Sequence, residues 1–411
     1  MMMRAKTSVL LLAVLVLALS TPAAAADRTG VTADTITIGM FGFYTGAGSS
    51  YGTGARDGAM IAINEVNAAG GVHGRKIKVI VEDDRSTPAG SIAAARKLIH
   101  NDKVFALINQ GGSNPMVATL PLLKESNVPL MAQMPSSPKV TRPLHRTIFR
   151  AASFNDQLQG WLIADFVMQH VKPNGRIAIL AQSDEYGKVG AQYVVERLQG
   201  QYKVAPVAVV EHDRDATDLS AQVLKLKDAK PDVVILYTYL RPGAIYLRQA
   251  KELGLTAQAV GSVGAGQRVT VSLAGENAEG AMFFTYLPIL EESDHPAMVA
   301  FTKKWKAAYP RVIDPGRPGL PDILGYVATR LFIKGLEQAG KDLTREGFVE
   351  TLETTRDFSH EGLMMPITFT ATNHDGMSQA TFFVIKGKQR HMTGVTVGTR
   401  KLLDEINALT Q

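Results

Sequence analysis

Gly112-Ser113-Asn114-Pro115 and Pro135-Ser136-Ser137-Pro138 are two short loops that share one pattern. Each follows a short apolar run, residues 105–108 before the first loop and 128–131 before the second, and such runs are typical of buried parallel strands. Each loop also places Ser shortly before Pro, a common way to begin a helix, because Ser is a good N-cap and Pro is tolerated in the first turn. The loops are therefore expected as strand-to-helix turns on neighbouring strands of one sheet.

Such a pair of turns would point backbone N–H groups and two hydroxyls at one place beyond the strand ends. A place of this kind suits a small anion such as a carboxylate. The plainer interpretation is that both loops are ordinary helix caps, and the residues alone leave the two interpretations open.

The rest of the chain continues this alternation, which predicts parallel sheets with helices on both faces. The rhythm restarts after Arg150, so two similar α/β lobes are expected. The C-terminal part is mostly helical over 295–354, carries strand-like runs at 365–370 and 380–385, and could return to complete the first lobe. Besides the two runs named above, the expected strands are 36–40, 76–81, 176–180, 204–210 and 233–236, and the expected helices are 53–68, 88–100, 156–170, 187–199, 218–228 and 243–253.

The N-terminal segment has the features of a secretory signal peptide. Arg4 and Lys6 give a charged start, an apolar core follows over 9–19, and Ala24-Ala25-Ala26 fits a small-residue cleavage site before Asp27. The apolar core is too short to span a bilayer comfortably. We therefore expect residues 1–26 to be removed and the mature protein to be periplasmic, with a retained N-terminal anchor as the alternative.

Composition indicates an ordinary globular protein of two domains. Removal of the signal peptide would leave 385 of the 411 residues, more than one typical core accommodates. The formal charge of +6 falls to +4 without Arg4 and Lys6 and is spread along the chain, so neither nucleic acid nor an anionic membrane surface is an expected partner. Because the chain has no cysteine, no disulfide supports the fold, which fits a large bacterial periplasmic protein.

Eight segments stand in a distinctive order and spacing. They are Ile36-Thr37-Ile38-Gly39, the Thr45-Gly46 and Tyr51-Gly52 loop, Gly54-Ala55-Arg56-Asp57-Gly58-Ala59, the run 63–71, Glu82-Asp83-Asp84, Tyr186-Gly187, Leu247-Arg248-Gln249-Ala250 and Ala278-Glu279-Gly280. Together they resemble the leucine/isoleucine/valine-binding solute receptors of ABC transporters, the type I periplasmic binding proteins. The resemblance covers essentially the whole mature chain.

The resemblance implies an α/β fold of two Rossmann-like lobes joined by three crossovers, with the ligand in the cleft between them. By analogy, the first lobe covers 27–153 plus 286–380 and the second covers 154–285 plus 381–411. The lobes would close on the ligand and present a new surface to an inner-membrane ABC permease. The implied protein is a monomeric, non-catalytic periplasmic receptor for a small carboxylate-bearing solute.

The resemblance also implies a set of binding residues. In the family a Ser in the first loop and a Ser or Thr in the second hold the ligand carboxylate, backbone groups of the second loop add contacts, and aromatic residues line the cleft. The matching positions in this chain are Ser113 and Ser136 for the carboxylate, Met134 and Ser136 for the backbone contacts, and Tyr51, Tyr186 and Tyr239 for the aromatic walls.

One position departs from the family pattern. Amino-acid binders carry an acidic residue after the strand near 257–261 to pair with the ligand's ammonium, and Val263 stands there in this chain. A buried ammonium without a carboxylate partner would cost on the order of several kcal/mol. Asp156 could substitute, but its interpretation as a helix cap is favoured. An aromatic or apolar organic acid is therefore favoured over a branched-chain amino acid, and Phe43 and Tyr44 would add aromatic surface.

Other kinds of site have little support in the sequence. The nine His are scattered without metal-ligand spacing, so no metal site is expected. Ser113 lacks recognisable His and Asp partners, and neither a nucleophile elbow nor a P-loop occurs. The glycines of 261–266 lack an acidic ribose partner, so no nucleotide cofactor is expected. An exported α/β hydrolase and a periplasmic sensor for a signalling partner remain as alternatives to transport.

Overall fold

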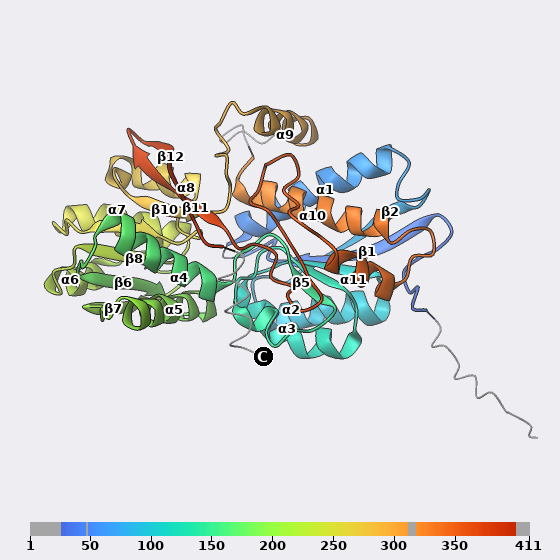
Figure 1. The fold of residues 1–411 in the computed structure, drawn as a ribbon, viewed down its shortest axis with the longest axis horizontal. Coiled ribbons are helices and arrows are strands. Elements are labelled where there is room, and N and C mark those ends of the chain that lie inside the picture. The colour runs from blue at the N-terminus through green and yellow to red at the C-terminus, as the bar shows by residue number, and fades with distance from the viewer. Residues whose placement is uncertain (1–25, 47, 311–317, 400–411) are drawn as a thin grey trace, which may run out of the picture.

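A computed structural model describes residues 26–46, 48–310 and 318–399, which form two α/β lobes lying side by side (Figure 1). The predicted signal peptide lies, apart from Ala26, outside the described residues. The first lobe contains a parallel five-stranded sheet, in which β3 and β4 are neighbours as predicted. In spatial order its strands are β2 (Lys76–Asp83), β1 (Thr35–Gly42), β3 (Ala106–Gln110), β4 (Leu130–Ala132) and β5 (Ile148–Arg150).

Helices cover both faces of this sheet, as expected for buried parallel strands. The strands β3 and β4 are buried throughout, whereas the edge strand β2 is mostly half-buried or exposed. The helices of this lobe are α1 (Ser49–Ala68), α2 (Pro88–Arg96), α3 (Ser113–Ser126), α9 (Pro296–Ala308), α10 (Leu320–Gln338) and α11 (Arg345–Glu353).

The second lobe contains a seven-stranded mixed sheet. Its strands β6 to β10 are parallel to one another. The late strand β11 pairs antiparallel with β10, and β12 pairs antiparallel with β11. The spatial order is β12 (Gln389–Val397), β11 (Ala380–Lys386), β10 (Met282–Thr285), β9 (Gln258–Gly261), β8 (Val233–Tyr237), β6 (Ile177–Gln182) and β7 (Ala208–His212). The helices are α4 (Asp156–Phe166), α5 (Glu185–Gln201), α6 (Ser220–Asp228), α7 (Leu240–Glu252) and α8 (Arg268–Ala274).

The chain passes between the lobes three times: after β5, after β10 and before β11 (Figure 1). The strand predicted at 380–385 is confirmed as β11, but the strand predicted at 365–370 is wrong. That segment makes only isolated bridges, such as Ile367 with Phe358 and with Met377, because it packs beside the third crossover rather than in a sheet. Within the described residues, no helix combines the length and the apolar character needed to cross a membrane.

Two glycines allow α1 and α10 to pack with their backbones in contact. A Cβ placed on Gly325 would lie 1.9 Å from the carbonyl oxygen of Ala55, and one on Gly58 would lie 1.8 Å from that of Asp322. Atoms cannot approach so closely, so only glycine fits at these positions. This packing fixes the first turns of both helices, which carry Tyr51 and Leu320 to the cleft between the lobes.

We predict that Gly325→Ala lowers the free energy of unfolding by about 1–3 kcal/mol, because the new methyl group forces two helix backbones apart. Urea unfolding followed by circular dichroism measures the change. Gly200→Ala is the matched control: Gly200 is exposed near the end of α5 with open space around it, so there the substitution is neutral or stabilising by up to about 1 kcal/mol. Equal stability of Gly325→Ala and the wild-type protein would contradict the packing argument.

Candidate functional site

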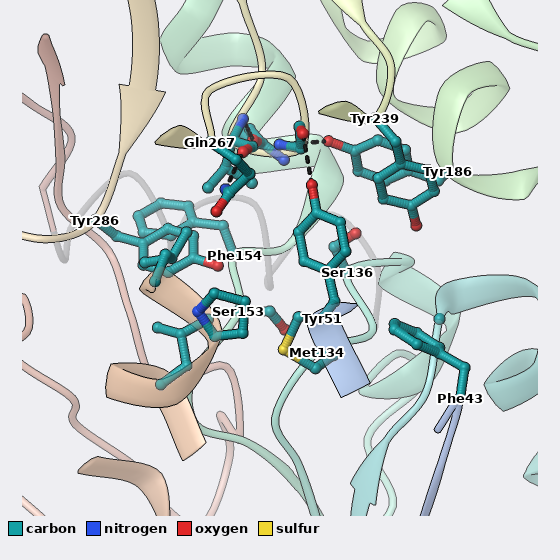
Figure 2. Close-up of a pocket in the computed structure, with 17 residues that line it drawn as sticks. Phe43, Tyr51, Met134, Ser136, Ser153, Phe154, Tyr186, Tyr239, Gln267 and Tyr286 are labelled. Atoms are coloured by element: carbon teal, nitrogen blue, oxygen red, sulfur yellow. Dashed lines mark hydrogen bonds between the residues drawn. The ribbon is translucent and has the colours of Figure 1, made fainter. Parts of the chain in front are cut away.

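A pocket with an empty volume of about 520 Å³ lies between the two lobes (Figure 2). This volume includes space that is open to solvent. Among the residues that the structure describes, none of those lining it is charged. They are Phe43, Tyr51, Gly112, Met134, Ser136, Ser153, Phe154, Gln159, Tyr186, Tyr239, Val263, Gly264, Gln267, Tyr286, Leu320, Pro321 and Leu324.

Aromatic rings form two walls of the pocket. Tyr186 stacks on Tyr239 with ring centroids 4.8 Å apart and planes 8° from parallel, and Tyr51 lies tilted against Tyr239 at 5.7 Å (Figure 2). On the other side, Phe154 and Tyr286 stack at 5.9 Å. Aromatic faces of this kind bind flat or branched apolar groups.

Hydrogen bonds close the two lobes around the pocket. The Tyr51 hydroxyl, on α1 of the first lobe, donates to the carbonyl oxygen of Gly264 in the second lobe at 2.7 Å. Tyr186, in the second lobe, binds the same loop: its hydroxyl donates to Ser262 Oγ at 2.9 Å and accepts the Gly264 N–H at 3.3 Å. A second bridge joins the Ser137 hydroxyl to Glu185 Oε1 at 2.9 Å. The structure is therefore a closed arrangement of the lobes.

The two loops that opened the sequence analysis meet. The first is a strand-to-helix turn between β3 and α3 as predicted, but Ser113 is not its N-cap, and the second does not begin an α-helix. The N-cap of α3 is Gly112, with Ser113 as the first helical residue, and the second loop leads only into a short 3₁₀ turn at Pro138–Val140. Ser113 Oγ accepts the backbone N–H groups of Ser136 at 3.0 Å and Ser137 at 3.1 Å. Ser113 thus fastens the second loop to the first, and of the two predicted serines only Ser136 lines the pocket.

The second loop is held from behind by the fully buried guanidinium of Arg150. It donates to the carbonyl oxygens of Ser136 at 2.6 Å and Ser137 at 2.7 Å. Its charge is balanced by Asp375, whose carboxylate lies 3.2 Å from Arg150 Nε and 2.9 Å from Arg142 Nη2. Burial raises the pKa of Asp375, but Arg150 and Arg142 outweigh burial and hold this pKa well below its usual range.

Asp156 lies fully buried, one side chain behind the pocket wall. The expectation that it caps α4 is wrong, since Asn155 is the N-cap and its side chain accepts the Gln157 N–H. The Asp156 carboxylate instead accepts from the Ser136 hydroxyl at 3.0 Å and from the Tyr237 hydroxyl at 2.8 Å. Burial raises the pKa of Asp156 to about 7, against the lowering effect of these hydrogen bonds.

Four long helices point their N-terminal ends at the pocket. Gly112 is the N-cap of α3, Tyr239 is the N-cap of α7, Tyr186 is in the first turn of α5, and Leu320 and Pro321 begin α10. Unpaired N–H groups and the helix dipole make such ends electropositive. These ends bring backbone N–H groups to the pocket, and acidic residues partly offset two of the dipoles: Asp184 and Glu185 at the start of α5, and Asp322 at the start of α10.

Six of the seven residues predicted for binding line the pocket, and Ser113 does not. Phe43 also lines it, whereas Tyr44 turns away to donate to Gln110 Oε1 at 2.7 Å. Sequence reasoning missed the residues at the crossovers and at the start of α10. Tyr286 comes directly after β10 and Phe154 lies shortly after β5, and an aromatic residue just beyond the last strand before a crossover is a signal that could have found them. The predicted residues in the lining are Tyr51, Met134, Ser136, Tyr186, Tyr239 and Val263.

Gln159 and Gln267, which the sequence analysis also missed, fix the region around Val263. The Val263 N–H donates to Gln159 Oε1 at 3.1 Å, and Gln267 Nε2 donates to the Val263 carbonyl oxygen at 2.8 Å. The backbone of Val263, the position that the resemblance matches to an acidic residue of amino-acid binders, is thus held by two neutral amides.

Comparison with known proteins agrees with this architecture. The family model described as "Periplasmic binding protein" matches residues 35–390. The "Leucine-, isoleucine-, valine-, threonine-, and alanine-binding protein" of Pseudomonas aeruginosa is 29% identical over 346 residues, which are 82% of this chain and 89% of that protein. The Leu/Ile/Val-binding protein of Escherichia coli K12 is 29% identical over 253 residues, 61% of this chain and 67% of its own length.

Solved structures share the fold. A substrate-binding protein of a branched-chain amino acid transporter from Streptococcus pneumoniae, in complex with isoleucine, superposes with a TM-score of 0.75 at 24% identity, over 89% of this chain and 99% of its own. A solute-binding protein of an ABC transporter from Rhodopseudomonas palustris, in complex with 3,4-dihydroxybenzoic acid, also gives 0.75, at 21% identity over 89% and 98% of the two chains.

Two lobes of Rossmann type that enclose a pocket at three crossovers define a ligand-binding receptor rather than an enzyme. The chain belongs to the periplasmic binding protein family, of the leucine/isoleucine/valine-binding type that the sequence analysis identified. It is a solute-binding protein.

We predict that Asp375→Asn lowers the free energy of unfolding at pH 7 by about 3–5 kcal/mol, because it leaves two buried guanidinium groups without their carboxylate. Since the pKa of Asp375 is held low, its stabilising effect is present above its unfolded value of about 3.9 and is lost only as the pH falls through the lower folded value. Urea unfolding at pH 5, 7 and 8 should therefore show a similar loss of unfolding free energy in the variant, relative to the wild-type protein.

The matched control is Asp342→Asn, which removes a carboxylate from an exposed pair with Arg28 and should change stability by less than about 1 kcal/mol. If Asp375→Asn were as mild as this control, the buried pair would not be needed to hold the second loop.

Proposed function

We propose that this protein is the periplasmic substrate-binding component of an ABC importer and captures a small carboxylate-bearing solute with an apolar or aromatic body. One observation carries the ligand class: the N-terminal ends of four helices converge on an aromatic pocket whose described lining has no charged side chain. Family membership and the signal-peptide features of residues 1–26 support the location and the transport role.

The electrostatics favour a carboxylate. Helix N-termini stabilise an anion through oriented N–H groups and the dipole, by about 0.3–1 kcal/mol each at exposed positions and more when buried. An ammonium in the same pocket would face these positive ends with Val263 in place of the family's acidic residue. An organic acid without an α-amine is therefore preferred.

A branched-chain amino acid is the second candidate, and a specific observation supports it. The relatives from Pseudomonas aeruginosa and Escherichia coli are each 29% identical to this chain over the aligned residues. Their names state that they bind leucine, isoleucine and valine. Asp156 is a carboxylate next to the pocket wall that could compensate an ammonium, acting through Ser136. The complex of a structural neighbour with 3,4-dihydroxybenzoic acid supports the first candidate, since this fold accommodates an aromatic acid.

A thermal-shift screen followed by calorimetry tests the proposal. Leucine, isoleucine, valine and phenylalanine are compared with their deaminated analogues, 4-methylpentanoate and 3-phenylpropanoate among them, and with 3,4-dihydroxybenzoate. A ligand that binds only the folded state stabilises it by RT ln(1 + [L]/Kd), so binders raise Tm. Tight binding of the acids supports the organic-acid form, tight binding of the amino acids with weak acids supports the second candidate, and binding of neither contradicts both.

We predict that Val263→Glu weakens binding of whichever acid the screen identifies by tenfold or more, because it adds a negative charge beside an anionic ligand. At about 4 Å and an effective dielectric constant near 20, such a repulsion is about 4 kcal/mol. Calorimetry measures it, with Val263→Gln as the neutral control of similar size. If both variants lost affinity equally, the loss would reflect shape rather than charge.

A further inference from the structure

The Ser113 hydroxyl can make one further hydrogen bond, as a donor. Its oxygen accepts the N–H groups of Ser136 and Ser137, which occupies both lone pairs. Its hydrogen therefore has to be donated, and Ser136 Oγ is the acceptor, at 3.4 Å. The direction of the bond between the two serines is fixed from Ser113 to Ser136.

The direction of the hydrogen bond between Ser136 and Asp156 depends on whether Asp156 is protonated. Ser136 Oγ lies 3.0 Å from Asp156 Oδ2. When Asp156 is ionised it can only accept, so the Ser136 hydrogen points at Asp156 and away from the pocket. When Oδ2 carries a proton, Asp156 donates to Ser136 Oγ, which then accepts from both Ser113 and Asp156. The Ser136 hydrogen is left to point into the pocket that this residue lines.

The rest of the Asp156 environment can accommodate either state. Gln159 Nε2 donates to the Tyr237 hydroxyl at 2.8 Å, so Tyr237 donates onward to Asp156 Oδ1 at 2.8 Å. Oδ1 therefore stays an acceptor, and a proton on this carboxyl belongs on Oδ2, next to Ser136.

Charge balance couples this proton to the ligand. The buried group of Arg142, Arg150 and Asp375 carries a net charge of +1. Ionised Asp156 offsets it when the pocket is empty. A ligand carboxylate beside Ser136 would be a second negative charge in the same buried region, and two such charges close together are not both retained.

We propose that Asp156 takes up one proton when a carboxylate ligand binds, and that this proton redirects the Ser136 O–H from Asp156 to the ligand. The inference rests on the proposed function and makes it specific: the site selects an anion without an α-ammonium. The proton comes from solvent and forms an O–H bond at Asp156 Oδ2; no other bond is made or broken.

The ionisation of Asp156 suits this role. Burial raises its pKa to about 7, and the charged groups that act on it are Arg150, which lowers the pKa, and Asp184, at the start of α5, which raises it. The other titratable groups that interact with Asp156 are the phenols of Tyr186, Tyr193, Tyr237, Tyr239 and Tyr286, and their pKa values are all raised, so they stay neutral.

Calorimetry with 3-phenylpropanoate and 4-methylpentanoate between pH 6 and pH 9 tests the proposal. Both probes are fully ionised in this range, because carboxylic acids have pKa values near 4. Affinity should fall once the pH rises above the pKa of Asp156, by about tenfold for each further pH unit. This amounts to about a hundredfold between pH 6 and pH 9. At pH 8, measurements in two buffers of different ionisation enthalpy should show uptake of close to one proton per probe.

Asp156→Asn gives the sharpest result. Its amide donates to Ser136 Oγ at every pH, so the variant should bind the probes with little pH dependence and more tightly than the wild-type protein at pH 9. A merely structural role for Asp156 would not produce tighter binding. If this variant does not fold, Ser136→Ala removes the transmitting hydroxyl: it should bind more weakly at pH 6 and keep only the part of the pH dependence that comes from repulsion between Asp156 and the ligand.

Asp84→Asn is the matched control, because burial raises the pKa of Asp84 to about 6 while its side chain lies outside the pocket lining. This variant should keep the wild-type pH dependence. Probe binding that is equally tight at pH 6 and pH 9 overturns the inference and leaves the receptor function intact. Binding of leucine with no binding of either acid overturns it in favour of the amino-acid form, and binding of no compound in the screen overturns both proposals.

Discussion

The binding site depends on one guanidinium that has no contact with solvent. Arg150 ends the last strand of the first lobe, donates to the carbonyl oxygens of Ser136 and Ser137, and pairs with Asp375 on the third crossover. A buried charge is tolerated only when all its partners are in place. The second loop, the first crossover and the third crossover therefore form as one unit, and the loop is positioned by the same group that joins the two lobes.

With the loop held from behind, the pocket needs few polar groups of its own. Ser113 is occupied in fastening the loops together, and Ser136 is left to line the pocket. The N–H groups at the helix ends are fixed by the backbone and need no reorganisation when a ligand arrives. An exposed Lys or Arg in the same place would lose its hydration and its side-chain freedom on closure. A site built from helix ends and aromatic faces avoids both costs.

Much of this architecture was predictable because it follows from local patterns. Buried apolar runs followed by turn residues correctly predicted that β3 and β4 are parallel neighbours, and the strand-like run at 380–385 was found as β11. The errors lie where a tertiary contact decided the outcome. Ser113 looked like a helix cap, but the approach of the second loop gave its hydroxyl two other donors. Asp156 also looked like a cap, yet Asn155 takes that role, and the carboxylate faces Ser136 and Tyr237 from distant segments.

Because the described lining carries no charge, selection among ligands has to come from the groups behind it. The fold itself does not decide the ligand, since neighbours with TM-scores of 0.75 hold isoleucine in one case and 3,4-dihydroxybenzoic acid in another. In this chain Val263 leaves one side of the pocket neutral, with its backbone held by Gln159 and Gln267. Asp156 is a carboxylate behind the wall, and it reaches the pocket through the Ser136 hydroxyl. The class of ligand that binds therefore depends on the charges buried behind the pocket wall. A change of one residue behind the wall can alter the ligand class without reshaping the cleft.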